Sequence, residues 1–138
     1  MIKAVLDANI LVSAFVVKVG KPAQILTASK AKHIVALTSE DILNEVTVTL
    51  LKPRITNRYN LTREKIEVFI KRVRAVSTVT PVHSTVTVVE RDPKDNMVLA
   101  CAVDGEAAYV VTGDKDLLEL KEYQGIHIVT PAQFLAVL

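Results

Sequence analysis

Aspartates stand after three apolar runs of this sequence, at the point where each run ends. The runs cover residues 2–6, 86–89 and 109–112. The aspartates that follow them are Asp7, Asp92, Asp95, Asp114 and Asp116. If the runs are parallel strands of one open α/β sheet, their carboxyl ends meet at the edge where such sheets bind ligands. The spacing therefore predicts that three separate segments deliver carboxylates to one rim.

A glutamate can reach the same rim from a helix. Ser39 is a favourable N-cap, and Glu40 and Asp41 place negative charge in the first turn of a helix that should end before Pro53. At 100° per residue, Glu45 falls about 110° from the centre of the apolar stripe of this helix. A carboxylate at the flank of the buried face can touch the sheet edge, so Glu45 is a candidate member of the acidic group.

Convergence of these carboxylates would require a counter-charge. Two carboxylates about 5 Å apart repel by about 3 kcal/mol at an effective dielectric constant of about 20. A cluster of them must therefore take up protons or bind a cation. The candidate ligands are oxygens without His or Cys, which favours a hard ion such as Mg²⁺ or Mn²⁺ over zinc. Such ions on carboxylates are typical of phosphodiester chemistry, in which a metal activates water.

Each acid taken alone has a simpler interpretation, because Asp and Asn favour turns and helix caps after strands. Asp92 precedes Pro93 and fits a turn. Asp95 could be only the N-cap of a helix over residues 96–103, and Asp116 only a cap or first-turn charge. Capping is the better interpretation of any single acid, whereas all of them at one rim, with Glu45 on a flank, favour a site.

The elements that must position these acids alternate along the chain. Thr62 can begin a helix over residues 62–76, and Thr130 with Gln133 forms a capping box for a last helix that should run to Leu138. Most of the apolar runs lack a strict alternation of apolar and polar residues, which suits central parallel strands covered on both faces. Strands alternating with helices predict a three-layer α/β/α fold with a central parallel sheet of about five strands. The predicted strands are residues 2–6, 34–37, 86–89, 109–112 and 126–129.

Length and composition exclude several classes of protein. The chain has 138 residues, a usual length for one domain, and we expect residues 1–138 to form a single domain. A single cysteine, Cys101, excludes a disulfide framework. The 50% hydrophobic content and the net charge of +2 exclude a disordered chain. No apolar run approaches the roughly 18 to 20 residues that span a bilayer. We therefore expect a soluble, unprocessed, cytoplasmic protein with no membrane partner.

Basic residues concentrate in residues 52–74, here called the basic segment. It holds eight Lys and Arg residues against Glu64 and Glu67, a charge of +6, whereas the rest of the chain carries −4. Lys and Arg beside an acidic metal rim would suit RNA, since they hold phosphates, although two ordinary solvated helices explain the charges equally well. Six aromatic residues are too few for an extensive base-stacking platform. The candidate RNA contacts are Lys52, Arg54, Arg58, Arg63, Lys94 and Lys115. Lys94 and Lys115 are adjacent to the candidate acids, so they could contact phosphate or only offset the repulsion between carboxylates.

Four short motifs occur in the order and approximate spacing of one known family. They are Val5-Leu6-Asp7-Ala8-Asn9, Ser39-Glu40-Asp41-Ile42-Leu43-Asn44-Glu45-Val46, Asp92-Pro93-Lys94-Asp95-Asn96 and Val111-Thr112-Gly113-Asp114-Lys115-Asp116-Leu117-Leu118. With them the chain resembles the PIN-domain ribonucleases over nearly its whole length. It looks most like the bacterial and archaeal branch related to the VapC-type toxins of toxin–antitoxin pairs.

The resemblance implies a metal-dependent endoribonuclease that uses Mg²⁺ or Mn²⁺ on four catalytic acids, Asp7, Glu45, Asp95 and Asp114. Asn9 would support this site, Asp116 would be an additional ligand, and Asp92 would be a supporting acid, because Asp95 matches the family's third acid better. The implied partners are RNA, an antitoxin protein, and further copies of the chain in a homodimer or higher homo-oligomer. The competing interpretation is a catalytically weak PIN-like domain that binds RNA or protein.

Overall fold

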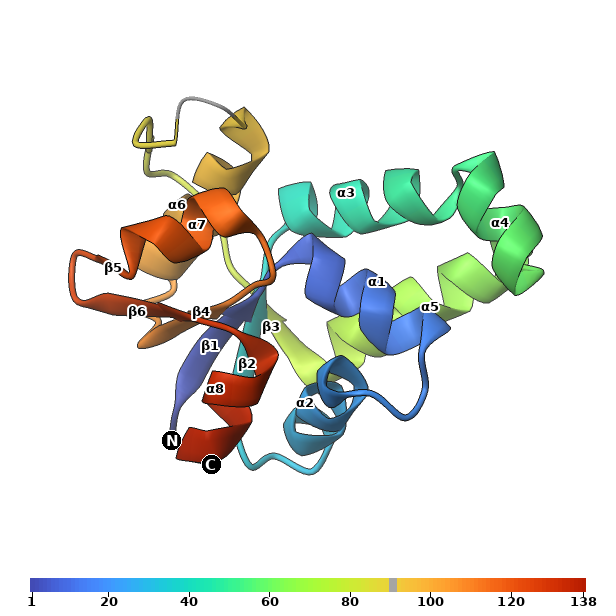
Figure 1. Ribbon diagram of the computed structural model, residues 1–138, viewed down its shortest axis with the longest axis horizontal. Helices are drawn as coiled ribbons and strands as arrows, with labels where there is room; N and C mark the ends of the chain where they lie inside the picture. The colour runs from blue at the N-terminus through green and yellow to red at the C-terminus, as the bar shows by residue number, and fades with distance from the viewer. Residues whose placement is uncertain (90–91) are drawn as a thin grey trace.

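The sheet at the centre of the molecule has six strands in the order β3-β2-β1-β4-β6-β5 (Figure 1). We describe it from a computed structural model, in which residues 1–89 and 92–138 are described. All neighbouring strands are parallel except β5 and β6, which form an antiparallel pair. The strands are β1 (Lys3–Leu6), β2 (Val35–Thr38), β3 (Ser77–Val79), β4 (Tyr109–Val111), β5 (Glu122–Tyr123) and β6 (Ile126–Val129).

Helices cover both faces of this sheet. The chain steps from β1 to β2 to β3 in one direction and then reverses to β4 and β6, so a right-handed crossover places α6 (Pro93–Asp104) on the face opposite α2 (Lys21–Lys30). Consistent with this, α6 packs against β1, β2 and β4, whereas α2 packs against β2 and against the last helix, α8 (Pro131–Val137), which follows β6 and returns to the face of α2. The predicted three-layer α/β/α fold is confirmed. The helices are α1 (Ala8–Val16), α2 (Lys21–Lys30), α3 (Glu40–Leu50), α4 (Pro53–Tyr59), α5 (Arg63–Val76), α6 (Pro93–Asp104), α7 (Lys115–Leu120) and α8 (Pro131–Val137).

The caps predicted from the sequence begin the helices as expected. The Ser39 hydroxyl accepts from the Ile42 N–H at 3.2 Å at the start of α3. The Thr62 hydroxyl begins α5 in the same way. At α8, Thr130 and Gln133 form the full capping box, with each side chain accepting from the other residue's backbone N–H. Each cap satisfies N–H groups that have no partner inside the helix.

The core lies on both faces of the two central strands. Val5 and Leu6 of β1 and Val110 and Val111 of β4 are at most 1% exposed. Removing such side chains from water stabilises the fold by about 1.5–3 kcal/mol each. Because the interior parts of β1 and β4 are fixed by this packing, the residues that follow these strands start from well-defined positions.

The prediction of a strand over residues 86–89 is wrong. Residues 86–89 form no strand, and the position beside β2 is taken by β3, whose pairing extends through a hydrogen bond from Thr80 N to Thr38 O at 2.8 Å. Val89 pairs instead with a side chain: its N–H donates to Asn96 Oδ1 (2.9 Å), and Asn96 Nδ2 donates to its carbonyl (2.8 Å). A Val- and Thr-rich run indicates extended backbone, but it does not identify the partner of that backbone.

The sheet also contains β5, which the sequence did not indicate, so it has six strands where about five were predicted. The other four predicted strands are present, with ends that differ by at most one residue from β1, β2, β4 and β6. The shortest strands are the least visible in the sequence because two or three residues show no period.

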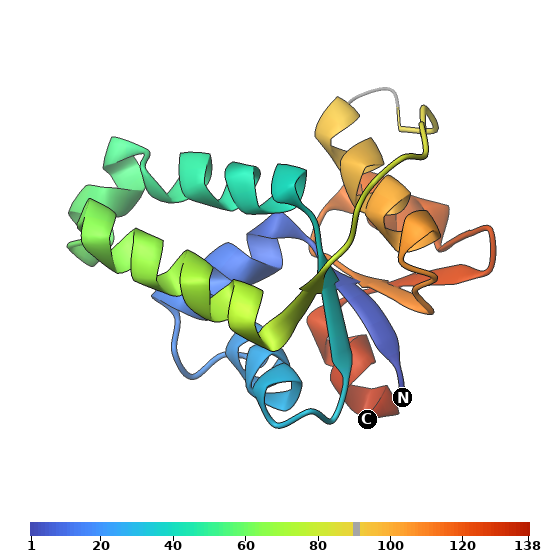
Figure 2. The same cartoon turned by 180° about the vertical axis from the view of Figure 1, so that it is seen from behind.

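The basic segment forms most of an arm that leaves the sheet. Helices α3 and α5 run side by side and α4 joins their far ends (Figures 1 and 2). Near the sheet the arm is closed by a two-pronged ion pair, in which both terminal nitrogens of Arg74 donate to the Glu40 carboxylate at 2.6 and 2.7 Å. Phe15 of α1 stacks on Phe69 of α5 with ring centroids 4.4 Å apart. The ion pair therefore joins the two long helices of the arm, and the aromatic stack joins the arm to α1.

In the described part of the chain, no single helix is long and apolar enough to cross a membrane. Only α1 and α2 taken together, with a bend of 98° between them, reach the required length and composition.

Candidate functional site

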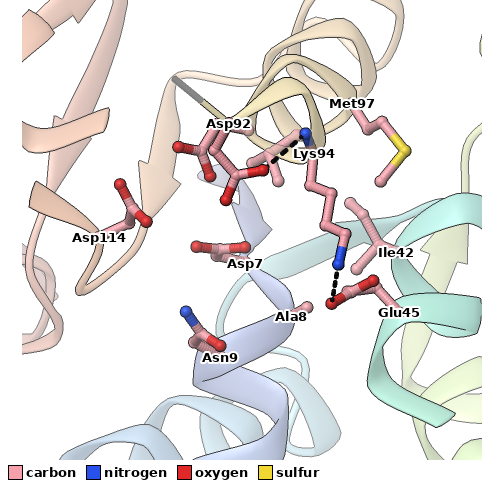
Figure 3. A pocket seen from close by; sticks show the side chains of 11 residues that line it. Asp7, Ala8, Asn9, Ile42, Glu45, Asp92, Lys94, Met97 and Asp114 are labelled. Carbon is pink, nitrogen blue, oxygen red and sulfur yellow. Dashed lines mark hydrogen bonds and ion pairs between the residues drawn. The ribbon is translucent and has the colours of Figure 1, made fainter. Parts of the chain in front are cut away.

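Carboxylates from four parts of the chain line one small pocket of about 120 Å³ (Figure 3). It lies beyond the carboxyl ends of β1 and β4, between the first turn of α6 and the middle of α3. The lining residues are Asp7, Ala8, Asn9, Ile42, Glu45, Asp92, Lys94, Asp95, Met97, Val98 and Asp114. The structure thus brings together the four acids that the sequence singled out, with Asn9, Asp92 and Lys94 beside them.

Asp7 enters the pocket from the end of β1. Its backbone N–H donates to Val111 O at 3.0 Å and so extends the pairing of β1 with β4 by one step. It is the N-cap residue of α1 but makes no side-chain cap, which leaves the carboxylate free to face the pocket. The side chain is 5% exposed. Burial raises the pKa of Asp7, against the opposing effect of a hydrogen bond from Thr112.

Thr112 is a site residue that sequence reasoning missed. Its hydroxyl donates to Asp7 Oδ2 at 2.6 Å and accepts from the Asp114 backbone N–H at 3.0 Å. One buried hydroxyl therefore contacts two pocket acids that follow the neighbouring strands β1 and β4. The available signal was the position of Thr112, at the end of the predicted strand and two residues before Asp114.

Asp92, Asp95 and Asp114 each offer a carboxylate oxygen within 4.8 Å of the others. Asp92 is the N-cap of α6, where Oδ1 accepts from the Lys94 N–H at 3.0 Å. The interpretation of Asp95 as that cap is wrong, since Asp95 lies in the first turn of the helix. Asp114 caps α7 through one oxygen, Oδ1, which accepts from two backbone N–H groups at 2.8 and 3.2 Å. Both capping acids thus also contribute a carboxylate oxygen to the close group with Asp95.

Asp95 is the acid of this group whose ionised form is most disfavoured by its surroundings. It is 5% exposed, and its Oδ2 is buried without a hydrogen-bond partner among the described residues. Burial, followed by the negative charges of Asp114, Asp92 and Asp7, raises the pKa of Asp95 to about 7. A buried carboxylate oxygen without a partner costs free energy that a bound proton or cation would recover.

Glu45 lies on the other side of Asp7 from Asp92 and Asp114 (Figure 3). Its position at the flank of the buried face of α3, predicted from helical geometry, directs the side chain into the pocket. Glu45 Oε1 is 3.3 Å from Lys94 Nζ, which reaches it across the pocket from α6. The sequence indicated that Lys94 could offset repulsion between carboxylates, but it did not identify Glu45 as the partner.

The remaining predicted residues lie outside the pocket lining. Asp116 is in the first turn of α7, just beyond the Asp114 cap, and Lys115 is exposed beside it. The other four predicted RNA contacts flank or belong to α4 and the start of α5, at the far end of the arm. They are Lys52, Arg54, Arg58 and Arg63, all of them exposed.

The donor set suits a hard divalent cation. Every pocket acid offers carboxylate oxygen, and neither His nor Cys is among the lining residues. Mg²⁺ and Mn²⁺ prefer such ligands. The buried Oδ2 of Asp95 gives an independent indication, because a cation beside it would supply the missing partner and offset the repulsion of the neighbouring acids.

The sequence and fold agree with proteins already known. Residues 3–116 match the PIN domain family. The chain is 30% identical to the uncharacterized protein MJ1680 of Methanocaldococcus jannaschii over 142 residues, which cover 97% of this chain and 90% of that protein. Among solved structures it is similar to a chain of VapBC2 from Rickettsia felis bound to a DNA fragment from their promoter. The TM-score is 0.64 at 15% identity, and the match covers 94% of this chain and 98% of that one.

At 15% identity the VapBC2 likeness shows the fold alone, whereas the family match covers most of the chain and every acid of the pocket. This chain is therefore a member of the PIN-domain family.

Proposed function

We propose that this protein is an endoribonuclease that depends on Mg²⁺ or Mn²⁺, and that it is the toxin of a toxin–antitoxin pair. The observation that carries the proposal is the convergence of Asp7, Glu45, Asp95 and Asp114 on one pocket, with a buried and unpartnered oxygen on Asp95. These four side chains are the catalytic acids of the proposal. Family membership supports the same assignment, since PIN domains are generally nucleases.

The pocket acids differ in how they would hold a divalent ion. Asp92, Asp95 and Asp114 lie close enough together to share one ion. Asp7 is fixed beside them by Thr112. Asp116 is proposed as an additional carboxylate outside the pocket lining. When bound, the ion would polarise the phosphate and lower the pKa of a bound water.

The other residues would position RNA. Asn9 is exposed at the pocket wall and offers an amide donor to a phosphate or sugar oxygen. Lys94 lines the pocket and Lys115 is exposed next to Asp114 in the sequence, so both are proposed to contact the phosphates next to the scissile one. The basic segment can hold more distant phosphates along the arm. These contacts are independent of base identity, so they would contribute affinity more than sequence preference.

An antitoxin and a second copy of the chain are the proposed protein partners. The similarity to a VapBC2 chain supports the first, because that protein is solved as a complex. Exposed apolar side chains support the second: Val17 and Val19 follow α1, and Val48 lies on α3, each at least 45% exposed. A cytoplasmic location follows as part of the proposal, since RNA and the antitoxin would be encountered there.

The test is RNA cleavage by the purified protein with added Mn²⁺, comparing the wild type with Asp7→Asn. We expect a loss of at least about 100-fold, the size found when one charge-stabilising group of an active site is removed. Asp41→Asn is the matched control, since Asp41 is an exposed acid in the first turn of α3. It should retain activity.

Cleavage that persists in EDTA, or equal rates for the wild type and Asp7→Asn, would show that the proposed site is not responsible. A wild type that binds Mn²⁺ and RNA without cleaving it would favour the alternative of a catalytically weak binding domain.

A further inference from the structure

Lys94 crosses the acidic pocket from one wall to the other. Its backbone is in the first turn of α6, and its side chain ends at Glu45 on α3, with 3.3 Å between Nζ and Oε1 (Figure 3). The side chains of Lys94 and Glu45 are 59% and 23% exposed. The contact therefore joins the flexible, solvent-exposed side chain of Lys94 to the mostly buried carboxylate of Glu45.

The pocket acids fall into two groups around Asp7. Asp92, Asp95 and Asp114 approach one another within 4.8 Å, and in the described residues Glu45 does not belong to this close group. Figure 3 shows Asp92 and Asp114 on one side of Asp7 and Glu45 on the other. We call the part of the pocket that holds Asp92, Asp95 and Asp114 the aspartate side. We call the part that holds Glu45 the glutamate side.

The two sides differ in counter-charge. No described basic side chain forms an ion pair with the three acids of the aspartate side, whereas the glutamate side has the Lys94 ammonium. An ammonium group neutralises one carboxylate and occupies the position that a cation ligated by Glu45 would need. A cation can bind the aspartate side without displacing Lys94, but it cannot bind Glu45 at the same oxygen while that ion pair persists.

We propose that Lys94 is an exchangeable counter-ion for Glu45, so that the pocket takes a first divalent cation on the aspartate side and a second one only after Lys94 has left the glutamate side. The inference rests on the metal site of the proposed function and adds an order of binding to it. Lys94 acts through Glu45: by pairing with this carboxylate it lowers the affinity of the pocket for the second cation.

The experiment counts Mn²⁺ ions by calorimetric titration of the purified, RNA-free protein at fixed ionic strength. For the wild type we expect one tight site and a much weaker second one. Lys94→Met keeps the length of the side chain and removes the ammonium, so it should strengthen the second site by about fivefold, the ratio for a partly exposed ion pair. Asp92 can still cap α6, because it accepts from the backbone N–H of residue 94.

Two further variants separate exchange at Glu45 from a general effect of charge. Lys115→Met removes an exposed ammonium that is adjacent in sequence to Asp114, so it should change the second affinity by less than about twofold. Glu45→Gln combined with Lys94→Met should lose the second site and keep the first. Circular dichroism of each variant checks that the fold is retained.

Equal second affinities for the wild type and Lys94→Met would overturn the proposal, as would equal gains from Lys94→Met and Lys115→Met. A second site that survives in the double variant would also overturn it. Absence of Mn²⁺ binding in every variant would overturn both this inference and the proposed metal site. A protein that binds Mn²⁺ in the expected order and cleaves no RNA would contradict the proposed function alone.

Discussion

Asp95 and Asp104 lie on the same helix, α6, in opposite environments. Asp95 is buried in the first turn against other carboxylates, and burial followed by their charges raises its pKa to about 7. Asp104 is the last residue of the helix, and its carboxylate accepts hydrogen bonds from the backbone N–H groups of His83 (2.6 Å) and Ser84 (2.9 Å) and from the Ser84 hydroxyl. The hydrogen bonds from the Ser84 side chain and then from the backbone hold the pKa of Asp104 below its usual range.

The helix dipole alone would give the reverse order, because negative charge is favoured at the N-terminus of a helix and disfavoured at its C-terminus. That effect is typically about 0.3–1 kcal/mol. Burial and direct partners outweigh it at both ends of α6. Asp104 therefore serves the fold by fixing the chain that leads from β3 toward α6. Asp95 is instead held in a costly state that suits a ligand-binding role.

Among the substitutions on α6, Asp104→Ala should lower the stability of the fold the most. Asp104→Ala removes the acceptor of three hydrogen bonds, all of them to a charged group, and leaves the N–H groups of residues 83 and 84 without their partner. We expect the melting temperature to fall by about 5 °C, as measured by circular dichroism. Glu119→Ala, which changes an exposed acid on α7, is the control and should shift it by less than about 1 °C. Equal melting temperatures for Asp104→Ala and this control would contradict the structural role.

A smaller effect of opposite sign is expected at the other end of α6. Asp95→Asn replaces a repelled charge with an amide that can donate to Asp92 or Asp114. In buffer free of divalent ions it should therefore raise the melting temperature by about 3 °C. Saturating Mn²⁺ should reverse the order, since the wild type alone would gain the free energy of metal binding. A variant that melts below the wild type without metal would show that Asp95 is not destabilising.

The positions of several pocket acids could be predicted from the sequence. Asp7 and Asp114 were placed correctly because each closely follows a buried strand, and the carboxyl ends of parallel strands must meet. Glu45 was placed correctly because the helical period fixes its angle to the buried stripe. Asp92 and Asp95 also line the pocket, but not because they follow a strand, as the sequence predicted. Residues 86–89 before them form no strand, and Val89 is held by two hydrogen bonds with the Asn96 side chain.

Contacts between distant side chains were the part that could not be predicted. The Thr112 bond to Asp7 spans 105 positions, the Lys94 contact with Glu45 spans 49, and the bonds of Asp104 span about 20. Each depends on rotamers that are chosen only after the helices and strands have packed. Residue type and spacing therefore identified the acids that gather in the pocket, but not the partners that hold some of them and leave Asp95 Oδ2 without one.

The smallest predicted effect concerns pH and tests the cause of the Asp95 shift. The pKa of Asp95 is raised from 3.8 to about 7 in the folded protein, so over that interval the folded state binds the proton that the unfolded state releases. The stability linked to Asp95 is therefore fully present below about pH 4 and is lost as the pH rises through 7. Between about pH 6.5 and pH 7.5 the metal-free wild type should lose about 2 °C of melting temperature relative to Asp95→Asn.

Thermal unfolding of both proteins across this range measures the difference directly. The burial-driven rise in the pKa of Asp7 acts in the same direction in both proteins, so it cancels from their difference to first order. If the difference stays constant with pH, the stabilisation produced by the Asp95→Asn substitution comes from packing or hydrogen bonding. The raised pKa of Asp95 would then have no support, and the contrast between the two ends of α6 would rest on hydrogen bonding alone.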